Sequence, residues 1–280
     1  MAIRNPIIAE IAYRTWCIDE YGMDAMFLLE GSEKALLIDT GTGVFDLPAL
    51  LPQLTDRPVQ AALTHGHVDH AGGMNMFPEV YAHPDDFEMA RGVTAEDRRD
   101  YTALIMGLSG GIYDITPDSV VVSERQAQLL PLKGGAVISL GNRDIEVFET
   151  PGHTPGGLSF LDRKERLLFS GDACNMNTIL TFGDSDRKKS GISDLLRTAK
   201  LLEDLHPFYD RHYNGHIGYA DMVSVMPMPE SLVRDCIELC EGLLDGSRAG
   251  VPDASNPFAG PCLLARNRTM QILYTPEQVR

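Results

Sequence analysis

The sequence is short of several features that would assign it to particular classes of protein. Its five cysteines are an odd number and form no Cys-x-x-Cys pair: Cys17, Cys174, Cys236, Cys240 and Cys262. This pattern is typical of reduced thiols in the cytoplasm and not of a disulfide framework. No run of 18 consecutive apolar residues occurs, so we expect no membrane-spanning helix. Residues 1–16 carry charged and polar residues before any apolar run forms, so we also expect no signal peptide.

Positive charge is scarce as well, with 24 Lys and Arg against 40 Asp and Glu and a formal net charge of -16. Nucleic-acid binding depends on Lys and Arg that displace counterions from phosphates, so this balance argues against a nucleic-acid partner. The chain of 280 residues shows no repeat and no Pro/Ser/Gly-rich linker. We therefore predict a single domain over residues 1–280 that acts on a small molecule. The sequence leaves the oligomeric state open, and a homodimer is compatible with it.

The sequence does contain a dense group of metal-binding residue types. His65, His67, Asp69 and His70 lie within six consecutive positions, although the chain has only 8 His. Imidazole nitrogens and carboxylate oxygens bind Zn²⁺, and Fe and Mn accept the same ligands. Alternate side chains of an extended or turning loop point the same way, so we expect His65 and His67 to bind one ion while Asp69 and His70 face a second. Histidines that only make hydrogen bonds are the alternative, which this density disfavours.

Strand and helix patterns alternate along the chain. Strands are predicted at 25–29, 35–38, 59–63, 79–83, 136–140, 145–149, 158–161, 166–169 and 269–274, and the first two form a hairpin. Helices are predicted at about 45–54, 95–106, 190–205 and 229–244. This alternation predicts layers with sheets inside and helices outside. Cys236 and Cys240 share the apolar face of the last helix and are expected to be buried.

Four further candidate residues lie in loops, most of them directly after a predicted strand. His153 lies in the turn Pro-Gly-His-Thr-Pro-Gly and is a candidate third ligand for the ion held by His65 and His67. Asp172 ends the strand 166–169, and His216 lies in a glycine-flanked turn. Asp39 follows the strand 35–38, where a carboxylate either orients a metal-bound histidine or caps the following helix; the residues leave both readings open.

Residues 84–130 form the least regular part of the chain, and we predict a variable insertion or lid there. The tract 107–111 is glycine-rich but lacks the Lys-Ser/Thr ending of a phosphate-binding loop. We expect residues 84–130 and 174–190 to select the substrate, although no individual substrate-binding residue can be named. His83 lies at the end of a predicted strand and is expected at the surface, with a position lining a pocket as the alternative. His206 and His212 are expected to be structural or exposed.

Taken in order, these motifs resemble those of the metallo-β-lactamase superfamily, in its glyoxalase II and lactonase-like branch. The match comprises Asp39-Thr40-Gly41, the His-x-His-x-Asp-His loop, the turn around His153, Ser-Gly-Asp172 and Gly-His216. The resemblance implies an α/β fold, a four-layer αβ/βα sandwich with a two-metal site at one edge of the paired sheets. It implies two Zn²⁺, with Fe or Mn as alternatives. One ion would be bound by His65, His67 and His153, the other by Asp69, His70 and His216, and Asp172 would bridge them.

This resemblance implies a di-metal hydrolase of a small ester, lactone or thioester. In such sites two ions about 3.5–4 Å apart share a hydroxide and polarise the scissile carbonyl. Asp69 would orient this nucleophile and pass a proton to the leaving group. Many β-lactam hydrolases of this fold have Arg where His70 stands and Cys where Asp172 stands, and the run 173–177 does not look like the matching segment of hydroxyacylglutathione hydrolases.

Other readings stay open. A mono-iron persulfide dioxygenase resembles this set but uses only two histidines and an aspartate. A β-lactam or phosphodiester hydrolase would use the same site, and the acidic composition disfavours the phosphodiester. A binding protein that has lost catalysis is the remaining alternative, which the presence of all seven ligand residues disfavours.

Overall fold

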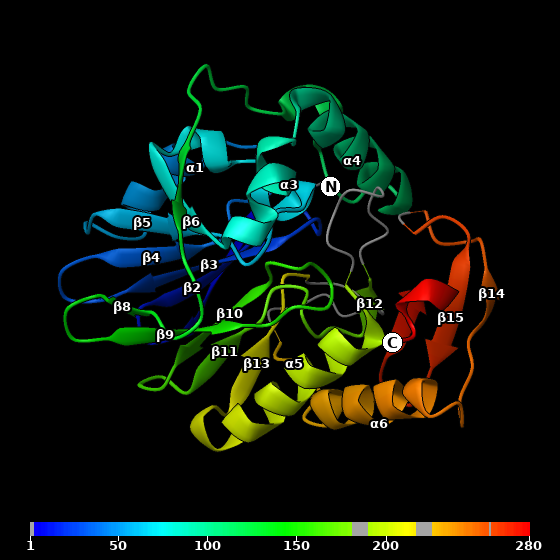
Figure 1. Ribbon diagram of the computed structural model, residues 1–280. Coiled ribbons are helices and arrows are strands. Elements are labelled where there is room, and N and C mark those ends of the chain that lie inside the picture. Colours follow the sequence, from blue (N-terminus) through cyan, green and yellow to red (C-terminus); the bar gives the residue numbers. More distant parts are fainter. Residues whose placement is uncertain (1–2, 181–189, 217–225, 258) are drawn as a thin grey trace.

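Two β-sheets lie face to face in the computed structural model, which describes residues 3–180, 190–216, 226–257 and 259–280 (Figure 1). The larger sheet has seven strands in sequence order: β1 (Ile7–Ala12), β2 (Thr15–Asp19), β3 (Ala25–Glu30), β4 (Ala35–Ile38), β5 (Val59–Ala62), β6 (Glu79–Ala82) and β7 (Gln128–Pro131). Neighbours are antiparallel from β1 to β4 and parallel from β4 to β7. The predicted hairpin is confirmed as β3 and β4, whereas the sequence patterns do not reveal β1, β2 and β7.

The second sheet has five strands in the order β13-β11-β10-β9-β8. Its strands are β8 (Val137–Ser139), β9 (Asp144–Glu149), β10 (Leu158–Asp162), β11 (Leu167–Phe169) and β13 (Arg211–Tyr213). A third sheet, in the order β12-β16-β15-β14, consists of β12 (Asn177–Ile179), β14 (Val251–Asp253), β15 (Cys262–Arg266) and β16 (Gln271–Tyr274). Of this third sheet only the last strand was expected from the sequence.

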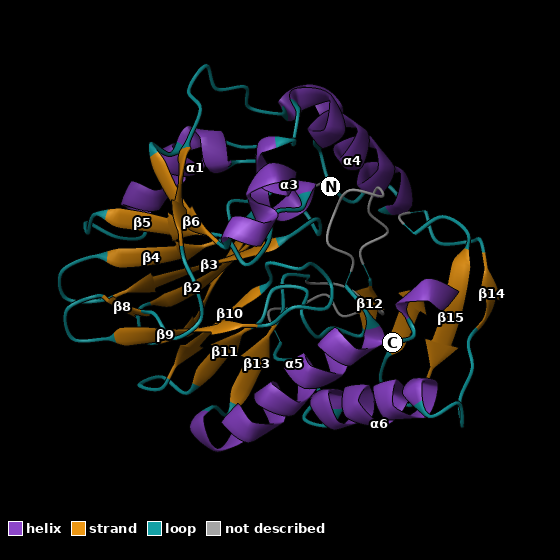
Figure 2. Ribbon diagram, viewed as in Figure 1, coloured by secondary structure: helices purple, strands orange, loops and turns teal. Residues whose placement is uncertain are grey.

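Helices cover the outer faces of the two main sheets (Figure 2). On the seven-stranded side lie α1 (Leu47–Leu50), α3 (Phe87–Arg91) and α4 (Ala95–Leu108); on the other side lie α5 (Ile192–Leu205) and α6 (Leu232–Leu244). The short helix α2 (Val68–Ala71) packs Ala71 into the apolar cluster of the seven-stranded sheet. Short 3₁₀ turns are η1 (Leu51–Gln53), η2 (Met74–Met76), η3 (Pro84–Asp86), η4 (Pro117–Ser119), η5 (His206–Phe208) and η7 (Pro276–Gln278). These layers confirm the four-layer αβ/βα sandwich. None of the described helices is both long and apolar enough to cross a bilayer.

Separate apolar cores hold the layers together. The core between the sheets joins β3 to β11, and the rings of Phe27 and Phe169 have centroids 4.7 Å apart. All four residues of β4 are buried, as expected for a strand covered on both faces. Under the second sheet, α5 and α6 pack on each other, and Cys236 and Cys240 are completely buried there, as predicted.

The strand directions bring the candidate residues to one end of both sheets. Asp39 and His65 follow β4 and β5, which run parallel, so their carboxyl ends meet at one edge of the larger sheet. In the second sheet β9 and β11 both pair antiparallel with β10 and therefore share a direction, and β13 runs parallel to β11. His153, Asp172 and His216 follow these three strands.

The segment expected to be a lid is largely helical and is tied to the rest of the chain. It contains η3, α3, α4 and the sheet strand β7. Arg98 of α4 is 6% exposed, and its guanidinium donates to the backbone carbonyls of Thr42, Gly43 and Val121 at 2.6–2.9 Å. Hydrogen bonds from a buried cation to three carbonyls fix α4 against the loop after β4.

Candidate metal centre

The structure brings all seven predicted ligand residues into one cluster. His65 Nε2 lies 3.1 Å from His67 Nδ1, which lies 2.8 Å from His153 Nε2. One potential ligand atom from each of these three residues lies within 4.8 Å of the others. The same holds for the group of Asp69, His70 and His216. The cluster therefore contains two triads of donor atoms.

Asp172 lies between the two triads. Its Oδ2 is 3.0 Å from His216 Nε2 and 3.6 Å from His153 Nε2, and its Oδ1 is 3.7 Å from His70 Nε2. A single carboxylate thus contacts histidines of both triads, although these residues are far apart in the sequence.

The His-x-His-x-Asp-His motif is part loop and part helix. His67 is extended, with ψ 162, and ends the loop after β5. The amides of His70 and Ala71 then donate to the His67 carbonyl at 3.1 and 2.8 Å and begin the single turn α2. The expectation of a loop throughout is therefore wrong for Asp69 and His70, which this helical turn carries. A four-residue helix is too short for a periodic sequence signal.

Two buried polar atoms indicate that the cluster fits a cation. Neither His70 Nε2 nor Asp172 Oδ1 has a hydrogen-bond partner in the part of the chain that the structure describes. Burial of such atoms is costly unless they are paired or bind a metal. Both atoms face the space between the triads, and imidazole nitrogens with carboxylate oxygens are suitable ligands for a divalent transition metal.

The protonation states of the cluster suit metal binding in the first triad. Burial lowers the pKa of His65 well below its usual value and that of His67 to about 3, so both imidazoles are neutral ligands at neutral pH. Burial also lowers the pKa of His70 and His216, but the surrounding carboxylates raise it by more. A metal ion at the second triad therefore competes with protons.

Hydrogen bonds fix the orientation of most of the rings. Asp39 accepts from the Thr64 amide at 2.6 Å, from Thr64 Oγ1 at 2.8 Å and from His70 Nδ1 at 2.9 Å. His216 Nδ1 donates to the Met23 carbonyl at 3.1 Å, and His153 Nδ1 donates to the carbonyl of Ile179. Such bonds leave Nε2 of each ring as the ligand atom. The helix-capping alternative for Asp39 is wrong, because Asp46 caps α1.

Three residues beside the cluster were not found from the sequence. Asp24 is fully buried with Oδ1 3.4 Å from His70 Nδ1, and neither of its oxygens has a hydrogen-bond partner among the described residues. Tyr101 of α4 donates to Asp69 Oδ2 at 2.7 Å. Asp86 accepts hydrogen bonds from the loops that carry His65 and His153. Of these three, only Asp86 could have been suspected from the sequence, because it follows a predicted strand that ends at the same sheet edge.

The remaining histidines are also placed. His83 is buried, contrary to expectation: its Nδ1 accepts from the Asp85 amide at 3.2 Å, and its Nε2 lies 3.4 Å from Glu149 Oε1 on the facing sheet. His212 is buried and structural, with Nε2 2.7 Å from Ser170 Oγ, and His206 is exposed. Within the segment expected to select the substrate, residues 181–189 lie outside the described residues.

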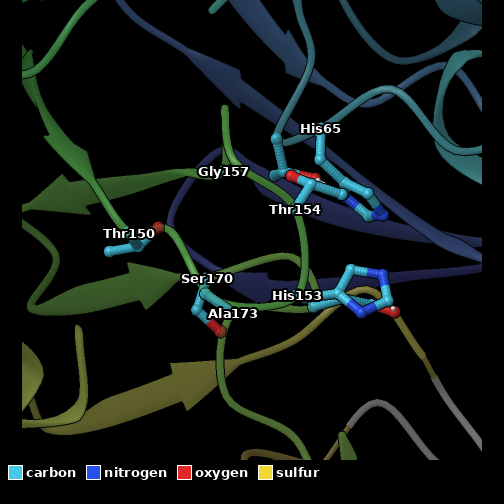
Figure 3. A pocket seen from close by; sticks show the side chains of 9 residues that line it. His65, Thr150, His153, Thr154, Gly157, Ser170 and Ala173 are labelled. Atoms are coloured by element: carbon cyan, nitrogen blue, oxygen red, sulfur yellow. Dashed lines mark hydrogen bonds and ion pairs between the residues drawn. The ribbon is translucent and has the colours of Figure 1, made fainter. Parts of the chain in front are cut away.

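A small pocket reaches behind the first triad. It is lined by Thr64, His65, Thr150, His153, Thr154, Gly157, Ser170, Asp172 and Ala173. In Figure 3 the rings of His65 and His153 lie on the side of this pocket opposite Thr150. The pocket thus belongs to the same cluster and not to a separate site.

Comparison with known proteins identifies the family of this chain. The family model described as "Metallo-beta-lactamase superfamily" matches residues 22–216. The acyl-coenzyme A thioesterase MBLAC2 of Homo sapiens is 31% identical over 199 residues, which are 64% of this chain and 67% of the relative. A probable metallo-hydrolase of Streptococcus pyogenes is 26% identical over 205 residues, covering 73% of this chain and 82% of the relative.

Solved structures show the same fold. The sec-alkylsulfatase Pisa1 from Pseudomonas sp. superposes with a TM-score of 0.63 at 16% identity, covering 86% of this chain and 42% of that one. The Rm3 metallo-beta-lactamase superposes with a TM-score of 0.53 at 20% identity, covering 88% of this chain and 94% of that one. The family match and the relatives named as thioesterase and metallo-hydrolase indicate a metal-dependent hydrolase. The chain belongs to the metallo-beta-lactamase superfamily.

Proposed function

We propose that this protein hydrolyses thioesters, with acyl-coenzyme A compounds as the substrate class, at a centre of two divalent metal ions. His65, His67 and His153 hold one ion, Asp69, His70 and His216 hold the other, and Asp172 lies between them. The contact of Asp172 with histidines of both triads is the observation that supports a centre of two ions, and the named human relative supports the thioester as substrate. Zn²⁺ suits this set of ligands, and Fe and Mn accept it as well.

The bound ions supply Lewis acidity, which acidifies a water molecule and polarises the carbonyl of the substrate. The protein's own groups do the rest. Burial would raise the pKa of Asp69, but His70 and His216 lower it by more, so its carboxylate is ionised at neutral pH. Asp69 Oδ2 is held by the Tyr101 hydroxyl at 2.7 Å. The Asp69 carboxylate can therefore accept a proton from the attacking water and hold it within the cluster.

A thioester fits this machinery better than an alkyl ester. A thiol has a pKa of about 8.5, so a thiolate leaves with little help from a proton donor, whereas an alkoxide needs one. The resemblance assigns proton transfer to Asp69 alone, and the sequence indicates no second residue as a general acid. The name of the human relative, an acyl-coenzyme A thioesterase, points to the same bond.

The test is an assay of the purified, metal-loaded protein with acetyl-, octanoyl- and palmitoyl-coenzyme A, followed by the release of free thiol. We expect turnover that a chelator abolishes and Zn²⁺, Fe²⁺ or Mn²⁺ restores. Asp172→Asn should lower kcat/KM by about 10²-fold or more, because it removes the negative charge that lies between the two triads that would hold the ions. Glu88→Gln, at an exposed side chain of α3, is the matched acid-to-amide control.

A fully metallated protein that hydrolyses none of these thioesters would refute the proposal. Parallel assays distinguish the other readings: oxygen uptake with a thiol persulfide tests the mono-iron dioxygenase, and nitrocefin and bis-p-nitrophenyl phosphate test β-lactam and phosphodiester hydrolysis. The dioxygenase uses three protein ligands, whereas seven candidate ligands converge here.

A further inference from the structure

The segment from η3 to α4 contacts the metal centre through two side chains that are not ligands. Asp86, at the end of η3, is 1% exposed. Its Oδ2 accepts from the Gly66 amide at 3.2 Å and from Thr154 Oγ1 at 2.7 Å, and its Oδ1 accepts from the Gly156 amide at 2.8 Å. Gly66 separates His65 from His67, and Thr154 follows His153. Asp86 therefore joins the two loops that carry the first triad.

Gly66 and Gly156 lie too close to Asp86 to be replaced by larger residues. A Cβ at Gly156 would lie 2.6 Å from Asp86 Oδ1, and a Cβ at Gly66 would lie 2.9 Å from the Asp86 carbonyl oxygen. Three donors converge on a carboxylate, which is an acceptor only. An Asn at this position would present an amide N–H group to at least one of these donors. The site therefore demands a carboxylate and not merely a polar side chain of that size.

Tyr101 contacts the second triad from α4. Its hydroxyl donates to Asp69 Oδ2 at 2.7 Å and lies 3.4 Å from the Met23 carbonyl, which also accepts from His216 Nδ1 at 3.1 Å. Arg98, one turn earlier on α4, is anchored by three backbone carbonyls. The phenol thus reaches Asp69 from a rigid support and lies close to the carbonyl that orients His216.

We propose that Asp86 and Tyr101 are positioning residues, one for each metal ion: Asp86 holds the loops of His65, His67 and His153 together, and Tyr101 fixes the Asp69 carboxylate of the second triad. The segment that looks like a lid in the sequence is, over η3, α3 and α4, a support for the metal centre. This inference rests on the two-ion centre of the proposed function but not on its substrate. Outer partners of metal ligands affect metal affinity by about 10- to 100-fold.

The test is titration of the chelator-stripped protein with Zn²⁺ in competition with a chromophoric chelator, which yields two dissociation constants. Asp86→Asn should raise the dissociation constant of the ion at the first triad by about 10- to 100-fold, and Tyr101→Phe should raise that of the ion at the second triad by a similar factor. Pairing each variant with a ligand variant assigns the ions. Asp86→Asn should not weaken the ion that remains in His153→Ala, and Tyr101→Phe should not weaken the ion that remains in His216→Ala.

Matched controls exist for both changes. Glu88→Gln alters an exposed acid of the same segment, and Tyr113→Phe removes a phenol hydroxyl from the apolar cluster that also contains Tyr101. If Asp86→Asn does not fold, Thr154→Val removes one of the same hydrogen bonds with a smaller change.

Three results would overturn the inference. The first is that both variants bind both ions as tightly as the wild type. The second is that each variant loses both ions together with thermal stability, which would indicate a structural role only. The third is a wild-type protein that does not bind two ions, which would refute this inference and the proposed metal centre together. A wild-type protein that binds two ions but hydrolyses no thioester would refute the proposed function alone.

Discussion

In the two-ion centre proposed above, replacement of Asp39 by Asn is expected to weaken binding of the ion at Asp69, His70 and His216 without disturbing the backbone. Asp39 has a φ of 64°, a left-handed conformation that Asn tolerates better than most residues. Its Oδ2 accepts from Thr64 Oγ1 and His70 Nδ1, and its Oδ1 accepts from the Thr64 amide. The Asn side chain has one oxygen for these three donors. Its amide group must face either the Thr64 N–H or the ring N–H of His70.

The size of the effect follows from the lost hydrogen bond to His70. A hydrogen bond to a charged group contributes about 1.5–3 kcal/mol, which corresponds to about 10- to 150-fold in affinity. If the Asn amide faces the ring, His70 Nδ1 must become an acceptor, and its proton moves to Nε2, the atom that faces the second triad. The loss should therefore fall on the ion held by Asp69, His70 and His216.

Competition titration with Zn²⁺ measures this effect directly, and kcat/KM for a thioester should fall by a similar factor. Asp56→Asn is the matched control, because Asp56 is exposed. The reasoning is refuted if Asp39→Asn binds the second ion within about twofold of the wild type, since orientation of His70 would then not depend on a carboxylate.

Three further predictions concern stability and packing. Burial lowers the pKa of His212 from 6.5 to about 4. The free energy of unfolding should therefore fall by up to about 3 kcal/mol as the pH drops from 6.5 toward 4. Urea unfolding of the metal-free His212→Gln variant should depend less on pH than that of the metal-free wild type. Arg143→Met leaves the buried Asp162 without its cation and should cost about 3–5 kcal/mol by denaturant unfolding; a loss below about 1 kcal/mol would contradict this. Gly215→Ala places a Cβ 2.3 Å from His70 Cε1 and should weaken the second ion more than the first in a Zn²⁺ titration.

The seven clustered residues were predictable because metal chemistry needs rare residue types at particular places. His65 and His153 both follow strands, and glycines beside them allow the backbone to turn sharply. Two glycine-flanked histidines that each follow a strand are hard to explain in one sequence unless they bind a metal. The larger layers were also predictable, because β4 is apolar throughout and α5 has an apolar stripe that packs in the core beside the second sheet.

The missed parts of the fold are those whose sequences depart from the usual strand patterns. β1 is apolar except for Glu10 and lacks the alternation of apolar and polar residues that marks a half-buried strand. β14 contains Pro252 and has no buried residue, so its sequence does not indicate a strand. Tyr101 and Asp24 contact the metal centre from segments with no motif. An Asp or Tyr on a helix or in a turn has the same local sequence whether it faces solvent or a cluster of histidines. The burial of His83 was not predicted for the same reason: its local sequence does not show that Glu149 of the facing sheet covers it.

The acidic groups around the metal centre explain how its loops are held before any ion binds. Asp39, Asp86 and Glu20 are each almost fully buried, and each accepts hydrogen bonds from backbone amides of a loop distant in sequence. Glu20 accepts from the amides of Gly43 and Val44 in the loop that Arg98 holds from α4, although burial raises its pKa to about 7. Because these bonds join the loops without a metal, binding of the ions need not be coupled to folding as it is in zinc fingers. We therefore expect removal of the metal ions to abolish the proposed hydrolysis while the sandwich remains folded.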